Sequence, residues 1–172
     1  ATTEIYTLSL HDALPISLRP ETPAAVTNPG THSCSRPRCT TCSYIHSPSQ
    51  IAGPHGSFTP RGSFTCISTN LVYCVSCLQC GIHYFGETKR RLGDRFVEHL
   101  RSIRKNLPGY PVAQHFGRPA HSIDDVRVCV LRGAPSDAKR VEIEQRLIHR
   151  LGTLTPGGIN VEFTAFKEPF KP

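Results

Sequence analysis

Cysteine and histidine occur in closely spaced groups along this chain of 172 residues, and that grouping restricts its fold more than any other feature. Two residues separate Cys77 from Cys80, and five residues separate His115 from His121. Thiolate and imidazole ligands at such spacings suit one tetrahedral zinc ion. The four residues therefore predict a structural Cys₂His₂ zinc site that ties two distant segments together, with free thiols and surface histidines as the alternative.

A second group of cysteines lies nearer the N-terminus. It consists of Cys34, Cys39, Cys42 and Cys66. His46 or His55 could replace Cys66 as the fourth ligand, so the ligand set stays open at that position. Residues 34–66 contain few large apolar side chains. A bound zinc ion would therefore have to supply the folding energy of this segment.

An even count of eight cysteines would also suit a secreted protein held together by disulfides. The N-terminus, however, lacks the basic segment followed by a continuous apolar segment that marks an export signal. Close Cys-x-x-Cys pairs in intracellular proteins usually bind metal. We therefore expect zinc rather than disulfides. Cys74 and Cys129 lie in predicted strands, and we expect them to be buried as small apolar side chains.

The net charge of +7 indicates a polyanionic partner. Nucleic acid is favoured over membrane because the sequence shows no basic amphipathic helix with an exposed apolar face. Arg36 and Arg38, between the N-terminal cysteines, indicate contact with nucleic-acid phosphate or else ordinary solubilising charge. Lys89, Arg90 and Arg91 are consecutive cations that could follow a DNA backbone. No apolar run approaches the roughly eighteen residues of a membrane span.

Composition divides the chain into four segments. Residues 1–33 predict a disordered start, and within them residues 1–16 resemble the translated read-through of a sequencing adapter. Residues 34–66 form the cysteine-rich linker, 67–162 a globular domain, and 163–172 a frayed tail. The chain contains no methionine, so we expect it to be a fragment of a longer protein.

The globular domain predicts an α+β fold. The expected elements are strands at 70–77, 81–87 and 126–131, and helices at 91–107 and 136–152. The loop between the first two strands ends in glycine, which suits a hairpin. This order predicts a small three-stranded, mostly antiparallel sheet flanked by helices.

The helix at 136–152 contains an acidic residue on its apolar face. Ser136 is expected to cap its start and Gly152 to end it. The expected apolar stripe consists of Val141, Leu147, Ile148 and Leu151. At 100° per residue, Glu144 falls at the centre of this stripe, where a carboxylate is costly unless it is paired or bound to metal. Glu142 falls off the stripe, so Glu144 is the favoured metal ligand.

The order and spacing of several residues together resemble the GIY-YIG endonuclease superfamily over about residues 66–162. These residues are Tyr73, the run Tyr84-Phe85-Gly86, Arg95, His99, Glu144 and Asn160. The sequence is more similar still to the nuclease domain of Penelope-like retroelements. In that subgroup Gly-Glu-Thr follows the second tyrosine, as at residues 86–88, and a Cys-x-x-Cys pair lies between the tyrosine motifs. The Cys₂His₂ set and the cysteine-rich linker also match this subgroup.

This resemblance implies a catalytic role for each of the matched residues. Glu144 would bind one Mg²⁺ or Mn²⁺, with water filling the other coordination positions. Arg95 would hold the scissile phosphate, because its planar fork matches phosphate oxygens. The connection before Arg95 is one residue longer than in some relatives, so Arg91 stays open as the phosphate ligand.

The remaining residues would arrange the reacting groups. Tyr73 would act as the general base or orient it, and a phenol takes a proton only if nearby positive charge lowers its pKa. Tyr84 and His99 would position water and phosphate by hydrogen bonding. Asn160 would brace the site.

The resemblance implies a nuclear, metal-dependent endonuclease that nicks DNA and so creates a primer for target-primed reverse transcription. DNA is the expected partner, with RNA as a second one, and the reverse transcriptase domain of the parent element would lie outside this chain. The alternative is a catalytically inactive, zinc-stabilised module that binds nucleic acid. Such a module would bind with strong salt dependence and cleave nothing.

Overall fold

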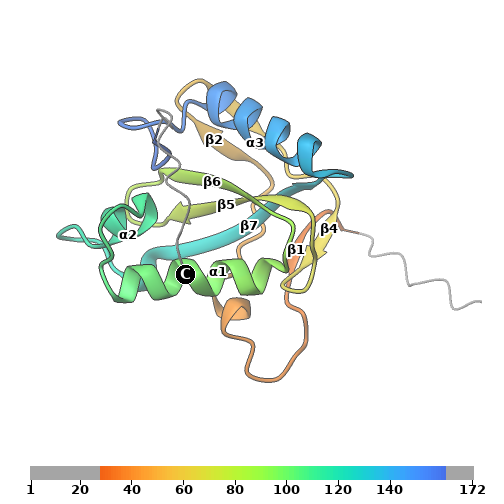
Figure 1. Cartoon of the computed structure of the whole chain (residues 1–172), viewed down its shortest axis with the longest axis horizontal. Coiled ribbons are helices and arrows are strands. Elements are labelled where there is room, and N and C mark those ends of the chain that lie inside the picture. The colour runs from red at the N-terminus through yellow and green to blue at the C-terminus, as the bar shows by residue number, and fades with distance from the viewer. Residues whose placement is uncertain (1–27, 162–172) are drawn as a thin grey trace, which may run out of the picture.

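The computed structural model describes residues 28–161. A three-stranded antiparallel sheet with strand order β6-β5-β7 lies at its centre (Figure 1). β5 spans Leu71–Cys77, β6 His83–Thr88 and β7 Val126–Gly133. The apolar run of β5 lies in the middle of the sheet and is buried almost throughout, as suits a strand covered on both faces. The predicted antiparallel sheet is confirmed.

Helices cover both faces of the sheet (Figure 1). α1 (Leu92–Arg104) and α2 (Pro111–Phe116) belong to one side, and α3 (Asp137–Leu151) covers the other. Alternate residues of β5 divide between two cores, because successive side chains of a strand point to opposite faces. Tyr73 and Val75 pack with α1, whereas Val72 and Cys74 pack with α3. The sheet is therefore the middle of three layers.

α3 begins and ends where the sequence predicts. Ser136 Oγ accepts a hydrogen bond from the Lys139 backbone N–H at 3.2 Å, and Gly152 ends the helix with a left-handed φ of 67°. The predicted stripe is wrong at one position, because Val141 is 46% exposed whereas Ile143 is 5% exposed. The buried arc is rotated from the predicted one, and Glu144 still lies within it.

Residues 28–66 pack onto the central sheet. They contain β1 (Gly30–His32), the short helix η1 (Thr40–Tyr44), β2 (Ile51–Gly53), β3 (Gly56–Phe58) and β4 (Ser63–Thr65). β1 pairs with β4 and β2 with β3. Ile51 and Phe58 are buried in the core beneath α3, and the Tyr44 ring lies 5.4 Å from that of Phe96 on α1. This segment gains its apolar contacts from the sheet and helices that it covers.

Disorder was predicted through residue 33, and for Gly30–His32 that prediction is wrong, because these residues form β1. The Val130 backbone N–H on β7 donates to Thr31 Oγ1 at 2.7 Å, which joins β1 to the central sheet. The predictions for residues 1–27 and 163–172 lie outside the described residues. Residues 28–161 also include the short helix η2 (Ile123–Asp125), and none of their helices is long and apolar enough to cross a bilayer.

Candidate active site and metal clusters

Tyr73 lies at the centre of the candidate active site. It faces Gly86 across the β5–β6 pair and is fully buried. A Cβ atom on Gly86 would lie 2.6 Å from Tyr73 Oη and 2.9 Å from Tyr84 Cε1. Both distances are too short for carbon, so only glycine leaves room for the Tyr73 hydroxyl over β6. The Tyr-x-Gly spacing thus has a packing reason.

Tyr73 connects two side chains that lie one turn apart on α1. Arg95 donates from Nε to Tyr73 Oη at 3.1 Å, and Tyr73 Oη lies 2.8 Å from His99 Nε2. Burial lowers the pKa of His99 to about 3, with the Arg95 charge acting in the same direction. The imidazole is therefore neutral. Arg95 can only donate to Tyr73 Oη, so the buried hydroxyl has its own hydrogen left to donate to His99 Nε2, which requires the tautomer with the proton on Nδ1. The result is a directed chain of hydrogen bonds from Arg95 through Tyr73 to His99.

Both tyrosines keep their protons in this environment. Burial raises the pKa of Tyr73, and the neighbouring Tyr84 acts in the same direction, whereas Arg95 opposes them less strongly. Burial likewise raises the pKa of Tyr84, whose ring lies 5.4 Å from that of His99. Tyr73 therefore lacks the lowered pKa that it would need to act as a general base. Its hydrogen bonds suit the orienting role.

Glu144 shares the electrostatic environment of these residues although it lies on α3. Burial raises the pKa of Glu144 to about 7, and the negative charge of Glu87 adds to that shift. The Glu144 charge in turn raises the pKa of Tyr73 and Tyr84, and Arg95 lowers that of Glu144. The two tyrosines, the guanidinium and the acid are therefore close enough for their charges to influence one another. Glu142, the rival ligand, instead pairs on the surface with Lys139 at 2.9 Å.

The consecutive cations of the 89–91 turn divide between different places. Arg90 donates to both oxygens of Glu98, at 2.7 and 2.8 Å. Arg91 is the N-cap residue of α1 and lines a hollow beside the N-terminal cysteines, whereas Arg95 contacts Tyr73. The structure therefore places Arg95, not Arg91, beside the tyrosines. Lys89 is exposed in the same turn.

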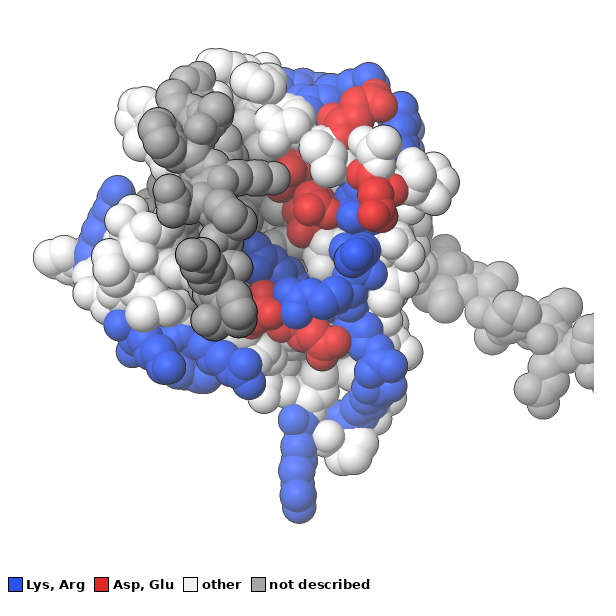
Figure 2. Space-filling view, viewed as in Figure 1, with Lys and Arg blue, Asp and Glu red and all other residues white. Residues whose placement is uncertain are grey.

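Sequence reasoning missed Glu98, which binds the site guanidinium. It accepts from Arg95 Nη1 at 2.9 Å, and these contacts, those from Arg90 most of all, lower the pKa of Glu98 to about 2. The signal available was its position three residues after Arg95 on one helix face. A hollow of about 370 Å³ opens beside Arg95 and His99, and Lys105 also lines it. Figure 2 shows basic side chains along α1 and acidic ones between α1 and α3 on this face.

Sequence reasoning also missed Arg140, which is only 4% exposed. It forms ion pairs with Glu87 on β6 and, at 2.9 Å, with Asp137 in the first turn of α3. Arg140 precedes Glu144 by one helical turn, so both lie on the face of α3 that is turned toward the sheet. The signal available in the sequence was the position of this cation, four residues before Glu144 on the same helix. Arg140 joins α3 to β6 directly beside Glu144.

Asn160 lies on the outer edge of β6. Its Oδ1 accepts from the Phe85 backbone N–H at 2.9 Å and from Thr153 Oγ1 at 2.9 Å. Its Nδ2 donates to the Phe85 carbonyl at 2.8 Å. The amide thus pairs with the backbone of β6 as a neighbouring strand would. Asn160 holds the turn at 155–160 against the residue that follows Tyr84.

The first metal cluster joins the loop after β5 to the region of α2. The ligand atoms of Cys77, Cys80, His115 and His121 all lie within 4.8 Å of one another, and Cys80 Sγ is 3.6 Å from His115 Nε2. A tetrahedral zinc site with bonds of about 2.3 Å to sulfur and 2.0 Å to nitrogen has S–N edges of about 3.5 Å. His121 Nε2 is a buried atom without a hydrogen-bond partner, and Nδ1 of the same ring lies 3.2 Å from the Pro119 carbonyl. That contact favours a proton on Nδ1 and leaves Nε2 free for metal.

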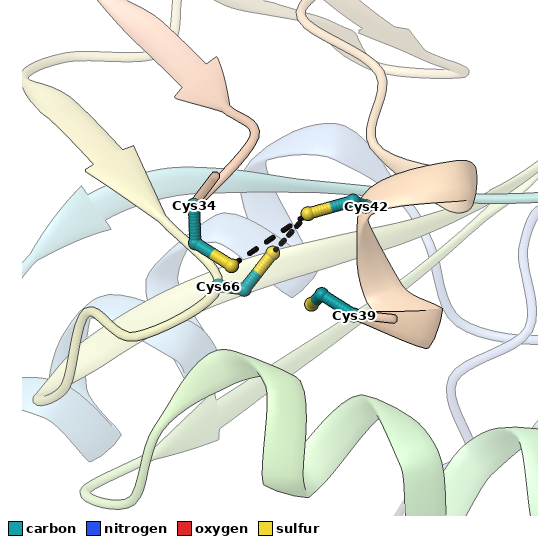
Figure 3. A group of neighbouring side chains, drawn as sticks. All are labelled: Cys34, Cys39, Cys42 and Cys66. Carbon is teal, nitrogen blue, oxygen red and sulfur yellow. Dashed lines mark hydrogen bonds between the residues drawn. The ribbon is translucent and has the colours of Figure 1, made fainter. Parts of the chain in front are cut away.

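The second cluster brings four cysteines together from separate elements (Figure 3). Cys34 follows β1, Cys39 and Cys42 belong to the η1 region, and Cys66 follows β4. Cys42 Sγ lies 3.6 Å from Cys34 Sγ and 3.5 Å from Cys66 Sγ, and all four sulfurs lie within 4.8 Å of one another. A tetrahedral zinc–thiolate site has S–S edges of about 3.8 Å. Cys66 completes the group, rather than His46 or His55.

All eight cysteines of the chain are free thiols in the structure. Cys74 and Cys129 belong to neither cluster. They lie opposite each other on β5 and β7, and both are buried in the core beneath α3. The six other cysteines all belong to the two metal clusters. Both clusters have the donor types and the spacing that fit a zinc ion.

The comparisons with known proteins give one distant structural likeness. No family model and no curated protein matches the chain. The fold is similar to a solved structure of the catalytic domain of homing endonuclease I-TevI, with 16% sequence identity and a TM-score of 0.46. The match covers 53% of this chain and 96% of that domain. At this distance the likeness assigns no function, which has to follow from the side chains of the site.

Proposed function

We propose that this chain is a divalent-metal-dependent DNA endonuclease of the GIY-YIG type that hydrolyses phosphodiester bonds. The proposal rests on the hydrogen bonds that join Arg95 to Tyr73 and Tyr73 to His99. The Glu144 carboxylate lies in the same electrostatic environment. A guanidinium, an ordered phenol and an acid are the groups that phosphodiester hydrolysis needs around one phosphorus atom.

Each side chain has a role that follows from its contacts. Arg95 uses Nε on Tyr73 and Nη1 on Glu98, and a guanidinium has five N–H donors, so further donors remain for a phosphate oxygen. Tyr73 donates to the neutral His99, which fixes its hydroxyl and the orientation of Arg95 together. The Tyr84 hydroxyl is suited to orient the attacking water by hydrogen bonding.

Glu144 is the residue that would hold the divalent cation. Desolvation and the negative charge of Glu87 both raise the pKa of the Glu144 carboxyl group. A bound cation would offset both effects. A single carboxylate with water in the other positions suits Mg²⁺ or Mn²⁺. When bound, the ion would supply charge stabilisation for the leaving 3′ oxygen and a more acidic water.

A plasmid-nicking assay tests this function. The purified chain should convert supercoiled plasmid to the nicked form with Mg²⁺ or Mn²⁺ and not with EDTA. Arg95→Ala should slow nicking by at least about 10²-fold, the loss typical for one donor to transition-state charge, and Glu144→Gln should abolish it. Glu142→Gln is the matched control on the surface of the same helix. Full nicking by Glu144→Gln would refute the metal assignment, and no nicking by the wild-type chain would refute the enzyme.

Both clusters are proposed to bind structural zinc. Thiolate and imidazole ligands at tetrahedral spacing favour Zn²⁺ over harder cations. Elemental analysis should find two zinc ions per chain. Thiol titration under denaturing conditions without reductant should release eight reactive thiols, whereas a disulfide-bonded secreted protein would release fewer.

The retroelement role is proposed from sequence features alone: the Gly86-Glu87-Thr88 run and the Cys77–Cys80 pair between the tyrosine motifs. A nuclease that primes reverse transcription must leave a 3′ hydroxyl at the nick. A polymerase should therefore extend the nicked plasmid without prior phosphatase treatment, and a product that resists extension would contradict this role. The proposal implies DNA as substrate and a nuclear location.

An inactive nucleic-acid-binding module is the second candidate. The pairing of Glu98 with both Arg90 and Arg95 favours it, because neutralised cations are less ready to bind a reacting phosphate. This candidate predicts DNA or RNA binding that weakens steeply with salt, and no cleavage with any divalent metal. Any metal-dependent nicking that disappears in Arg95→Ala decides against it.

A further inference from the structure

The first turn of α1 depends on backbone acceptors outside the helix. Arg91, its N-cap residue, makes no side-chain capping hydrogen bond. Instead the N–H groups of Leu92 and Gly93 donate to the carbonyls of Ser68 at 3.0 Å and Cys66 at 2.8 Å. Helix starts leave such N–H groups without partners inside the helix. The turn from Cys66 to Ser68 therefore fixes where α1 begins.

The same turn belongs to the four-cysteine cluster, of which Cys66 is a member. A Cβ on Gly93 would lie 3.2 Å from the Cys66 carbonyl and 3.5 Å from Thr41 Oγ1, so α1 is in close contact with the turn. Thr41 is buried and lies between Cys39 and Cys42 in sequence. Both sides of the cluster thus touch the start of α1, which lies beneath the cluster in Figure 3.

The start of α1 controls the position of the catalytic guanidinium. The Arg95 backbone N–H donates to the Arg91 carbonyl at 3.2 Å, one turn into the helix, and the Arg95 side chain contacts Tyr73. A shift of that first turn would move Arg95 relative to β5. Misplacement by even about 1 Å can lower a catalytic rate by about 10²-fold.

We propose that the four-cysteine cluster is a zinc site whose task is to fix the first turn of α1 and thereby position Arg95 against Tyr73. Cys66 and Gly93 are the positioning residues, acting through the backbone. This inference rests on the zinc and nuclease assignments of the proposed function. It adds that nicking depends on zinc at a cluster that lies outside the group of tyrosines, Arg95 and Glu144.

The experiment compares Cys39→Ser with Cys80→Ser, which alters the other cluster. Each variant should lose one zinc ion per chain by elemental analysis. Cys39→Ser alone should speed amide hydrogen exchange at Leu92 and Gly93, by about tenfold, since a net hydrogen bond is worth about one order of magnitude in an equilibrium. Its kcat for nicking should fall by about 10²-fold. Cys39→His, which restores a zinc ligand, should return zinc content, exchange and kcat toward wild type.

Zinc loss in Cys39→Ser with wild-type exchange at Leu92 and Gly93 would overturn the proposal. Faster exchange of the β5 amides would show that Cys39→Ser has lost its fold. In that case Gly93→Val tests whether the contact between the Cys66 turn and α1 controls nicking. This variant leaves every ligand in place and pushes α1 from the Cys66 carbonyl. It should keep both zinc ions, speed exchange at residues 92–93 and slow nicking, and unchanged exchange and nicking would refute the role.

The readouts separate this inference from the function on which it rests. A wild-type chain that never nicks DNA refutes the nuclease, while zinc content and amide exchange still decide whether the cluster fixes α1. A wild-type chain that nicks DNA but holds zinc only at the Cys₂His₂ cluster refutes the inference and leaves the nuclease standing.

Discussion

Arg95 donates from Nε to the hydroxyl of Tyr73 across 3.1 Å, although the two residues come from a helix and a strand 22 positions apart in sequence. Tyr73 is fully buried and donates a hydrogen bond from its hydroxyl to His99 Nε2. The guanidinium is thus oriented by a neutral phenol, whose pKa is raised by burial. The relationship makes the Tyr73 hydroxyl a positioning group for Arg95, and the effect of removing it can be measured.

Tyr73→Phe should slow nicking by about 10²-fold, as loss of one preorganised contact does in other sites. It should also destabilise the fold by about 1–3 kcal/mol, because Arg95 Nε and the buried His99 Nε2 lose a partner. Plasmid nicking and urea unfolding measure the two effects. Tyr44→Phe, whose ring packs on Phe96, is the control. Wild-type nicking by Tyr73→Phe would exclude the orienting role.

Glu144→Gln should stabilise the metal-free fold at pH 8 and leave it unchanged at pH 4. The pKa of Glu144 is raised from 4.5 to about 7 in the folded chain, so its contribution to stability is present below pH 4.5 and is lost as the pH rises through 7. Allowing for partial solvent exposure, the variant should gain about 2 kcal/mol at pH 8. Thermal unfolding in EDTA measures this.

Glu142→Gln is the control for that experiment, and its expected change in stability at pH 8 has the opposite sign. The Lys139 ammonium lowers the pKa of Glu142, so its ionised form stabilises the fold above pH 4.5. The variant should lose a little stability at pH 8. Equal responses of both variants would contradict the desolvation of the Glu144 carboxylate.

Glu98→Gln should separate DNA binding from catalysis. Arg90 and Arg95 would lose the carboxylate that neutralises both of them, so DNA binding should tighten about two- to tenfold at low salt. The single-turnover nicking rate should fall, because Arg95 loses one of the two contacts that orient it. Filter binding and rapid-quench measurements give the two numbers. Tighter binding with faster nicking would mean that Glu98 only inhibits the site.

Asn160→Ala should destabilise the fold by about 2–3 kcal/mol, because the Phe85 N–H and carbonyl both lose their partner. Nicking at a temperature where the variant is folded should stay within about threefold of wild type, since the amide contacts backbone and not the reacting groups. Urea unfolding monitored by circular dichroism gives the stability. A large loss of kcat in a fully folded variant would assign Asn160 a direct part in the chemistry.

The features that sequence could predict are those with a local rule. Ser136 and Gly152 bound α3 because caps have strong residue preferences, and the apolar, β-branched run of β5 indicates a buried strand. Tyr73, Arg95 and His99 were expected together, and the structure joins them. These relationships need only spacing along the chain and one resemblance.

The features that sequence reasoning missed depend on tertiary contacts. Val141 and Ile143 are both apolar, and only the rotation of α3 against β6 decides which is buried. Arg140 looks like a surface cation until Glu87 on another element pairs with it. Gly30–His32 has little strand propensity of its own and is ordered by pairing with β4 and by the contact of Thr31 with β7.

Both edge strands of the three-stranded sheet, β6 and β7, form hydrogen bonds with other segments of the same chain. On β6 the Asn160 amide pairs with Phe85, and on β7 the His46 N–H donates to the Val128 carbonyl at 3.0 Å while Thr31 accepts from Val130 at 2.7 Å. Open strand margins recruit strands from other molecules and lead to fibrils. These contacts occupy backbone groups of β6 and β7 that a strand of another molecule could otherwise pair with, and that protection would be lost at β6 with Asn160 and at β7 with the N-terminal segment.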